Sequence, residues 1–459
     1  MALLLLIACP IDQIENESAQ NSEKEITAFS FMAADNTELS SDVTGIISGT
    51  DIDLTVPYGT DVTALVASFA TTGASVTVDG TEQTSGTTAN DFSNPLTYRV
   101  TAADNTWQDY TVTVEPAAPA AEEGPGFSSA SSPGDTGILN MAESSQNLTM
   151  IYANDSASIT FPTGLDDDVI ATLPTQFWVA ETEVTNAVVA AVFQWAYDND
   201  RFSTTVGDHN GLDATTVKHG GQQLLNLDDA DCRVDYDGSG SFTAESGYDD
   251  HPVTNITWYG AVMFCNWLTE MRDGTIDNVV YTEIDTDWED HETTENIERN
   301  GYRLPSTDEW EYAARYRGGD STNTVGGYSN PYFTQGDSAS GATTYYNDNT
   351  NGSGEPGKTA NDAVAVYGEY WDGSSWVSTG TTHEAEVKSL GAGSANALGL
   401  YDISENVCEW CFTEYSGDRI WCSGGWDFTA MFLQIGQGFR EYPGDEFNWL
   451  GFRPCRTAD

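Results

Sequence analysis

The chain has 459 residues, too many for one hydrophobic core, so we expect two or three domains. Its 72 acidic residues outnumber its 16 basic ones, and the formal net charge of -56 excludes nucleic-acid binding and favours solubility or cation binding. The alternative is an acidic surface that is only solvated. The 13 tryptophans, 21 tyrosines and 18 phenylalanines supply ample material for globular cores.

The first residues form a short apolar run, MALLLLIAC over 1–9, which ends at Cys9. This run resembles the bacterial lipobox, in which small residues precede a cysteine that is lipidated and becomes the mature N-terminus. The run is shorter than an ordinary signal core and lacks a positive start, so we expect the given start to be truncated. A polar tether follows over 10–24. We predict lipidation at Cys9, a membrane anchor and a place in a bacterial cell envelope, extracytoplasmic or surface-exposed. A chance apolar tip is the alternative.

Residues 25–115 predict an all-β domain. Six short segments alternate apolar and polar residues between Gly, Asn, Asp and Thr turns, which is typical of an antiparallel sandwich. The six segments are 26–31, 51–59, 63–73, 74–80, 96–105 and 109–114. This stretch resembles bacterial immunoglobulin-like envelope modules, which implies a spacer without catalysis.

Residues 116–137 are rich in Pro, Ala, Gly and Ser, which indicates a linker. The remaining 138–459 form the second domain, in which three helices are expected. The first lies within 177–197 and follows Thr182, and the second begins after Thr257 as N-cap. The third lies within 303–319, where Ser306 and Glu309 make a capping box.

Six blocks of the second domain identify a family by their order: 177–186, 251–270, 302–319, 396–410, 419–426 and 451–456. They resemble the successive blocks of the formylglycine-generating-enzyme (sulfatase-modifying-factor) family. The resemblance implies an α+β fold class: an irregular C-type-lectin-like domain, here preceded by the immunoglobulin-like sandwich.

The catalytic residues of that family do not carry over. Its active members bind copper(I) through two cysteines that stand two and seven residues past the aromatic residue of the Gly-Gly-Ser-aromatic block, and soft thiolates suit that ion. Here Phe428 and Leu433 occupy the positions counted from Trp426, so no catalytic residue is assigned and copper is not expected. A substitute site among Cys408, Cys411 and Cys422 is the alternative. The pairing of the six remaining cysteines stays open: Cys232, Cys265, Cys408, Cys411, Cys422 and Cys455.

The family also places a structural calcium ion in the block over 396–410. The matching positions are Asp402, the carbonyls of Glu405 and Val407, and Glu409. Hard oxygen ligands in one tight loop suit calcium. Glu405 departs from the family's glycine, which puts the loop conformation in question, and an acidic turn without an ion is the alternative.

The segment between the Gly-Gly-Trp and Gly-Phe-Arg blocks mixes aromatic and polar residues without a sustained period. Exposed aromatic residues in a loop indicate a recognition surface. The pattern resembles the retroelement-diversified variable proteins of this family, which implies contact with a protein or carbohydrate ligand. The candidate contact residues are Asp427, Phe428, Met431, Phe432, Gln434, Gln437, Phe439, Glu441, Tyr442, Asp445, Phe447, Asn448 and Trp449. Ordinary family loops are the alternative.

Three functions follow from these observations. The first is an envelope-anchored lipoprotein that displays a ligand-binding domain. The second is an oxidoreductase of the formylglycine-generating type, acting on a sulfatase cysteine through an altered site. The third is a structural envelope component, against which the aromatic segment argues.

Overall fold

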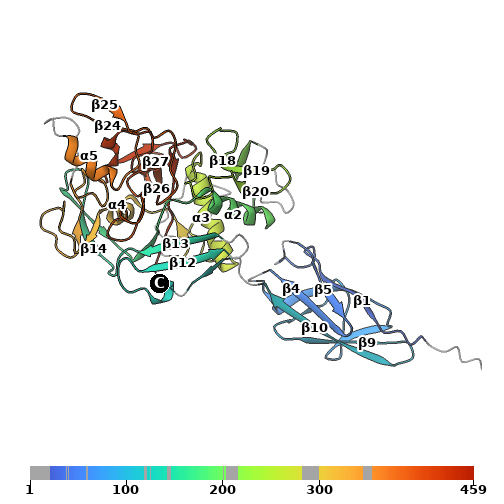
Figure 1. The fold of residues 1–459 in the computed structure, drawn as a ribbon. Coiled ribbons are helices and arrows are strands. Elements are labelled where there is room, and N and C mark those ends of the chain that lie inside the picture. Colours follow the sequence, from blue (N-terminus) through green and yellow to red (C-terminus); the bar gives the residue numbers. More distant parts are fainter. Residues whose placement is uncertain are drawn as a thin grey trace, which may run out of the picture. The chain divides into compact units, whose positions relative to one another are not determined.

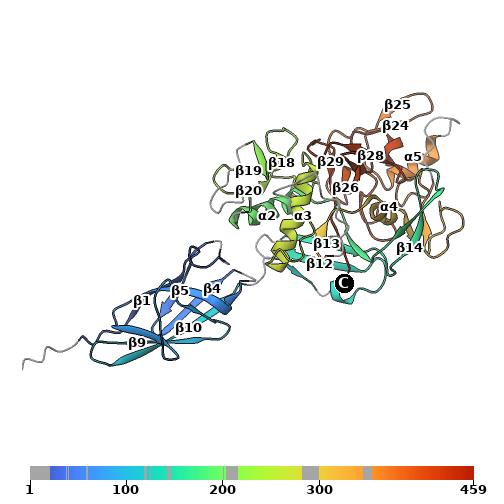
Figure 2. The same cartoon turned by 180° about the vertical axis from the view of Figure 1, so that it is seen from behind.

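The computed structural model describes residues 21–37, 39, 41–57, 60–117, 121–124, 126–141, 146–199, 201–202, 215–281, 299–344 and 354–458. The chain divides into two compact units, Met1–Ala118 and Pro119–Asp459 (Figures 1 and 2). Cys9 and most of the expected tether lie outside the described residues, so the lipid anchor stays a prediction. Among the helices described, none has both the length and the apolar content that crossing a membrane requires.

The N-terminal unit consists of two β-sheets, with strand orders β2-β1-β5-β8 and β3-β4-β10-β9-β6-β7. Its strands are β1 Ile26–Phe31, β2 Val43–Thr44, β3 Ile46–Ser48, β4 Asp51–Val56, β5 Leu65–Thr71, β6 Ser75–Val78, β7 Thr81–Glu82, β8 Ala89–Asn90, β9 Leu96–Thr101 and β10 Trp107–Pro116, with a 3-10 turn η1 at Val62–Ala64. Each of the six predicted segments contains a strand because alternation turns its apolar residues inward, as in β4, where Ile52, Leu54 and Val56 are buried. The prediction of an all-β domain is confirmed.

One pair of strands corrects the expected antiparallel arrangement. β4 and β10 run parallel, with Ile52 opposite Val112. After β4 the chain crosses to the other sheet as β5, and it reaches the free side of β4 only with its last strand. A long crossover of this kind permits parallel pairing, whereas a hairpin enforces the antiparallel one.

The expected linker over 116–137 is shorter in the structure. β11 (Ala121–Glu123) pairs with β12 (Thr136–Met141), and the short helix α1 (Gly126–Ser129) lies between them. The ring of Phe127 packs on Trp178 of the second unit, with centroids 4.7 Å apart. The composition is typical of a linker, but this aromatic contact and the strand pairing draw the segment into the second unit.

A six-stranded sheet, β11-β12-β13-β16-β30-β21, forms the base of the C-terminal unit, and a four-stranded sheet, β28-β27-β26-β29, carries its last segments. The further strands of these sheets are β13 Gln146–Tyr152, β16 Phe177–Ala180, β21 Tyr302–Arg303, β26 Cys408–Tyr415, β27 Asp418–Cys422, β28 Gly438–Glu441, β29 Leu450–Gly451 and β30 Cys455–Thr457. Paired strands outside them are β14 Ile159–Thr163 with β15 Val169–Leu173, β17 Thr216–His219 with β18 Gln222–Asn226, β19 Val234–Tyr236 with β20 Phe242–Ala244, β22 Tyr316–Gly318 with β23 Tyr332–Phe333, and β24 Glu369–Trp371 with β25 Trp376–Ser378.

The longer helices are α2 Asn186–Asp198, α3 Trp258–Asp273, α4 Thr307–Arg315 and α5 Gly354–Asp362, and a 3-10 turn, η3, spans Ala430–Leu433. α3 lies beside α2, and it is buried along nearly its whole length (Figures 1 and 2). Thr257 caps α3, and the capping box of Ser306 and Glu309 begins α4, as predicted. The first helix follows Thr182, as predicted, and begins at Asn186, because the Thr185 hydroxyl caps it by accepting from the Val188 N–H. Phe177–Ala180 before it form β16, which pairs with β30.

Candidate functional site

Strands β26, β27 and β28 form a sheet whose two faces carry different chemistry. Neighbouring residues of a strand point to opposite faces, so Trp421 of β27 points away from Ile420 and Cys422. Ile420 and Cys422 line a pocket, whereas Trp421 contacts aromatic rings of the segment 428–449. The sheet therefore separates two candidate sites.

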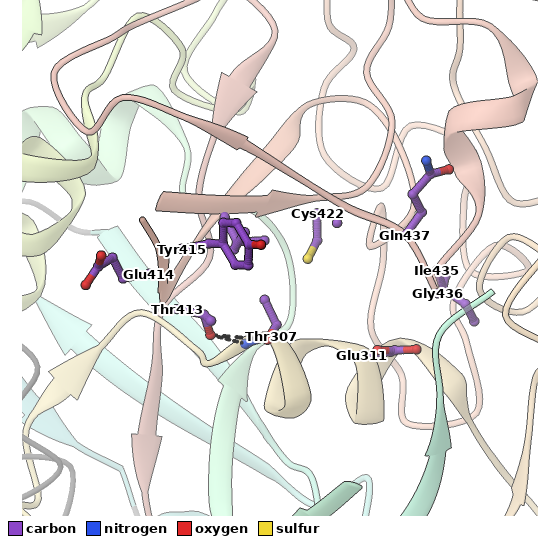
Figure 3. A pocket seen from close by; sticks show the side chains of 11 residues that line it. Thr307, Glu311, Thr413, Glu414, Tyr415, Cys422, Ile435, Gly436 and Gln437 are labelled. Carbon is purple, nitrogen blue, oxygen red and sulfur yellow. Dashed lines mark hydrogen bonds between the residues drawn. The ribbon is translucent and has the colours of Figure 1, made fainter. Parts of the chain in front are cut away.

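The pocket lies between α4, the β26–β27 hairpin and the segment 435–438 (Figure 3). Its volume is about 290 Å³, close to the lower end of the range of about 300–1,000 Å³ for small-molecule pockets. The hydroxyls of Thr307 and Thr413 are 3.2 Å apart at its wall, and the side chains of Glu311, Cys422 and Gln437 also face it. A pocket of this size and mixed polarity suits one small polar group.

The opposite face carries six aromatic rings, each in contact with at least one other, which we call the aromatic surface. Its members are Trp421, Phe428, Phe432, Phe439, Phe447 and Trp449. Trp421 is 4% exposed and forms the base, on which Phe439 stacks with ring centroids 4.6 Å apart. Phe447 stacks on Trp449 at 4.5 Å, and Phe428 lies 5.0 Å from Trp449. Rings fixed by one another offer contact area at little entropic cost.

All thirteen predicted contact residues are at least partly exposed. Between them, Ala430, Leu433 and Ile435 are buried and hold the segment to the core. The thirteen do not form one surface, since Gln437 lines the pocket and the rings lie on the other side of the sheet. Their contact with a ligand stays a prediction.

The two positions of the family's copper cysteines lie in different surroundings. Phe428 belongs to the aromatic surface, and Leu433 is 1% exposed in a small apolar cluster. Among the other thiols, Cys411 Sγ lies 3.8 Å from Cys422 Sγ, and Cys408 Sγ bonds to the Ser423 carbonyl. Burial raises the pKa of Cys408 and Cys411 well above the ordinary value, which disfavours the thiolates that copper(I) needs.

The loop 402–406 carries buried carboxylates with unused oxygens. Asp402 Oδ2 accepts from the Lys388 N–H at 2.7 Å. Asp402 Oδ1 and both carboxylate oxygens of Glu405 have no hydrogen-bond partner within the described ranges. Burial, and then the neighbouring Asp402 and Glu183, raise the pKa of Glu405 well above its ordinary value. Positive φ angles of 57° and 66° occur at Asp402 and Asn406 but not at Glu405, so the glutamate in place of glycine does not require a left-handed backbone.

Glu409, the last of the expected calcium ligands, forms an ion pair with an arginine. Arg453 Nε lies 2.8 Å from its Oε1 and 2.9 Å from its Oε2, and the Trp310 indole N–H donates to Oε2 at 2.7 Å. Both partners of the Glu409–Arg453 ion pair are fully buried. The sequence did not indicate this pair because Arg453 lies 44 residues further along the chain.

A residue missed by the sequence analysis completes this loop. Glu183 is 1% exposed, and its carboxylate accepts from the Val407 N–H at 3.1 Å and from the Asn406 side-chain amide at 3.2 Å. Burial, followed by Asp402 and Glu409, raises the pKa of Glu183 well above its ordinary value. The sequence signal that could have identified Glu183 was an acidic residue directly before Val184, in the approach to an apolar helix.

The pocket had no local signal in the sequence, because its walls come from distant segments.

Two family matches cover most of the chain. Residues 168–458 match the sulfatase-modifying factor enzyme 1-like domain, and residues 26–114 match the SGBP N-terminal domain. A curated relative, the chaperone protein LppX of Paenibacillus barcinonensis, is 29% identical over 232 residues, which are 44% of this chain and 67% of the relative.

Solved structures with similarity to the chain include three proteins at a TM-score of 0.36. Treponema denticola variable protein 1 is 20% identical and covers 68% of this chain and 96% of its own. CarF is 21% identical and covers 66% of this chain and 94% of its own. PvdO from Pseudomonas aeruginosa is 15% identical and covers 72% of this chain and 100% of its own.

Proposed function

Because the chain belongs to the sulfatase-modifying factor enzyme 1-like family but carries Phe428 and Leu433 at that family's copper-cysteine positions, we propose that it binds a ligand instead of oxidising a cysteine. The aromatic surface is the observation that carries this proposal. Five of its six rings are partly exposed, although aromatic side chains of this size usually bury most of their area.

The chemistry of the surface favours a neutral carbohydrate ligand. Rings present flat apolar faces, and Asp427, Glu441 and Asp445 belong to the same segment and offer acceptors for hydroxyl groups. The net charge of -56 disfavours an anionic ligand. The match of residues 26–114 to the N-terminal domain of surface glycan-binding proteins supports the same ligand class.

An array of neutral oligosaccharides, followed by calorimetry with the best binder, tests the proposal on the full chain. Trp449→Ala should weaken binding by about 2 kcal/mol, roughly 30-fold, as expected for a central aromatic contact. Tyr415→Ala is the matched control, because Tyr415 is 60% exposed and lines the pocket instead. Unchanged affinity of the Trp449 variant would contradict the carbohydrate proposal. So would binding of the chain to proteins immobilised beside the oligosaccharides but to none of the oligosaccharides.

The competing enzymatic function requires copper. Cys411 and Cys422 are the nearest approach to a thiolate pair, and they lie on the pocket side of the sheet. Titration of the reduced chain with copper(I) against a chromophoric chelator separates the two functions. Stoichiometric copper together with oxygen-dependent turnover of a cysteine-containing peptide would replace the binding proposal with the oxidase.

A structural cation at the loop 402–406 is part of the same proposal. Asp402 and Glu405 fit it, since Asp402 Oδ1 and both Glu405 carboxylate oxygens lack a partner among the described residues, whereas Glu409 fits it less well, since it already pairs with Arg453. Calcium, if bound there, would neutralise carboxylates that burial otherwise keeps from ionising. In this chain Asp402 and Glu405 would hold the ion, and Glu183 would orient the loop through Val407 and Asn406.

We further propose display on the cell envelope through a lipid at Cys9. The SGBP match and the curated relative support an envelope or surface location. Diversification of the segment 427–449 by a retroelement is also a proposal, and the neighbourhood of the gene tests it. A reverse transcriptase together with a near-copy of the 3′ end is expected there, and their joint absence would contradict it.

A further inference from the structure

A second group of potential metal ligands lies apart from the aromatic surface. It neighbours the loop 402–406, whose Asn406 side chain accepts from the Ala385 N–H at 2.8 Å, but it shares no ligand with that loop. One ligand atom each of His251, His383 and Glu384 lie within 4.8 Å of one another. We propose that these three side chains bind a divalent transition metal ion of the zinc type. This inference is independent of the proposed function.

The backbone brings the three residues together from distant parts of the sequence. His251 directly precedes the segment that leads into α3, and its carbonyl accepts from the buried amide of Asn186 at 3.0 Å. His383 and Glu384 lie in the connection after β25. The Val387 N–H donates to the Asp250 carbonyl at 2.9 Å and fixes that connection beside His251. The approach of the ligands is therefore held by backbone bonds on both sides.

Glu384 supplies the observation that points to a cation. Its side chain belongs to a residue only 2% exposed, and its Oε1 has no hydrogen-bond partner in the described part of the chain. That oxygen lies 3.7 Å from His251 Nδ1, beyond hydrogen-bond length. A metal ion would provide the missing partner.

The histidines are in the state that a metal requires. His251 Nδ1 lies 3.1 Å and His383 Nδ1 lies 2.6 Å from the same acceptor, the Glu384 carbonyl. A carbonyl only accepts, so a neutral ring that bonds to it carries its proton on Nδ1 and keeps the Nε2 lone pair free.

The distances require a modest closure on binding. Ligand atoms of a tetrahedral zinc site lie roughly 3.3 Å apart for bond lengths near 2.0–2.1 Å. His383 is exposed, so its side chain can rotate, giving up its contact with the Glu384 carbonyl, and close the difference from 4.8 Å. Two imidazoles and one carboxylate favour zinc or a similar ion over calcium, and three protein ligands leave a fourth position for water or an incoming group.

The nearby cation does not oppose this site. The Arg233 guanidinium lies 4.2 Å over the ring of Tyr248, which in turn lies 4.8 Å from the ring of His251. Arg233 is bonded to Glu245 at 2.9 Å and lies 3.7 Å from Asp231. Arg233 thus makes its ion pairs with these two carboxylates, and none with Glu384 among the described residues.

Zinc competition against a chromophoric chelator tests the proposal on the chelator-stripped full chain. Excess calcium and physiological salt should be present, because both saturate the many exposed carboxylates. One equivalent of zinc is expected, and cobalt(II) in its place should give the visible absorption of a tetrahedral ion with nitrogen and oxygen ligands. His383→Ala should lower the affinity by more than the roughly 10–100-fold that loss of an outer hydrogen-bond partner costs.

Two controls keep the outcome decisive. Glu386→Gln removes a charge from the same connection without removing a ligand and should retain the site. His383→Ala concerns an exposed side chain, so its circular dichroism and melting temperature without metal should match those of the wild type. Absence of a stoichiometric zinc ion overturns the proposal. A zinc ion that His383→Ala still binds also overturns it, because the ion then has other ligands. If that ion is lost only when the cysteines are alkylated, those ligands are thiolates.

Discussion

Replacing Glu405 by glutamine should stabilise the metal-free C-terminal unit at neutral pH. Glu405 is 0% exposed, and neither carboxylate oxygen has a hydrogen-bond partner among the residues described. Its folded-state pKa is raised above the ordinary value of 4.5 by burial, then by Asp402 and Glu183. The folded chain therefore retains a proton that the unfolded chain releases. The contribution of this proton to stability is complete below the pKa that Glu405 has in the unfolded chain. It is lost as the pH rises towards the pKa that Glu405 has in the folded chain.

The magnitude follows from this linkage. One retained proton lowers the unfolding free energy by about 1.4 kcal/mol for each pH unit above the unfolded pKa. Between pH 4.5 and 7.5 the loss is at most about 4 kcal/mol for Glu405 alone. Glu405→Gln removes this dependence, and a calcium ion at the loop should remove it in the wild type.

Urea unfolding at a series of pH values, with and without calcium, measures the effect. Tryptophan fluorescence reports the C-terminal unit, because Trp107 is the only tryptophan among residues 1–118. The unfolding free energy should fall less steeply with pH in the variant. The difference in slope should reach up to about 1.4 kcal/mol per pH unit, which corresponds to one proton. Equal slopes in variant and wild type between pH 5 and 8 would refute a buried protonated Glu405.

The other predictions concern single side chains. Glu409→Gln should destabilise the C-terminal unit by about 3–5 kcal/mol, opposite in sign to Glu405→Gln, because it leaves Arg453 buried without a counter-charge; a neutral effect in urea unfolding would contradict the ion pair. Treatment with diamide should join Cys411 and Cys422, whose Sγ atoms are 3.8 Å apart, and peptide mapping after alkylation should find that pair and not Cys265. Cys9→Ser should move the protein from the membrane to the soluble fraction of cells, and retention in the membrane would rule out the anchor.

Local signals in the sequence were sufficient for the elements that depend on neighbours in the chain. Thr257 and the pair of Ser306 and Glu309 determine where α3 and α4 begin through bonds within one turn. The strand β16 just before α2 was not predicted, because it pairs with β30, which follows some 280 residues later. The linker was overestimated for a similar reason, since Phe127 finds Trp178 only in the folded unit.

The candidate site divides in the same way. The exposed positions of the segment 427–449 could be read from its mixed aromatic and polar composition. The ion pair of Glu409 with Arg453 and the approach of His251 to Glu384 could not, because both depend on contacts between distant segments. Such pairs carry no local signature, and a single sequence holds no record of which distant residues change together.

The alternation of β27 and β28 restricts how the last segment of the chain can change during evolution. Substitutions at Phe439 alter the aromatic surface. Substitutions at Arg440, which pairs with Ile420, alter the pocket side, so each surface can change separately. Insertion of one residue into β28 would exchange the two faces of that strand and turn the ring of Phe439 towards the pocket. A lineage that diversifies this protein should therefore keep the reading frame and the length of 438–441 constant while their side chains vary.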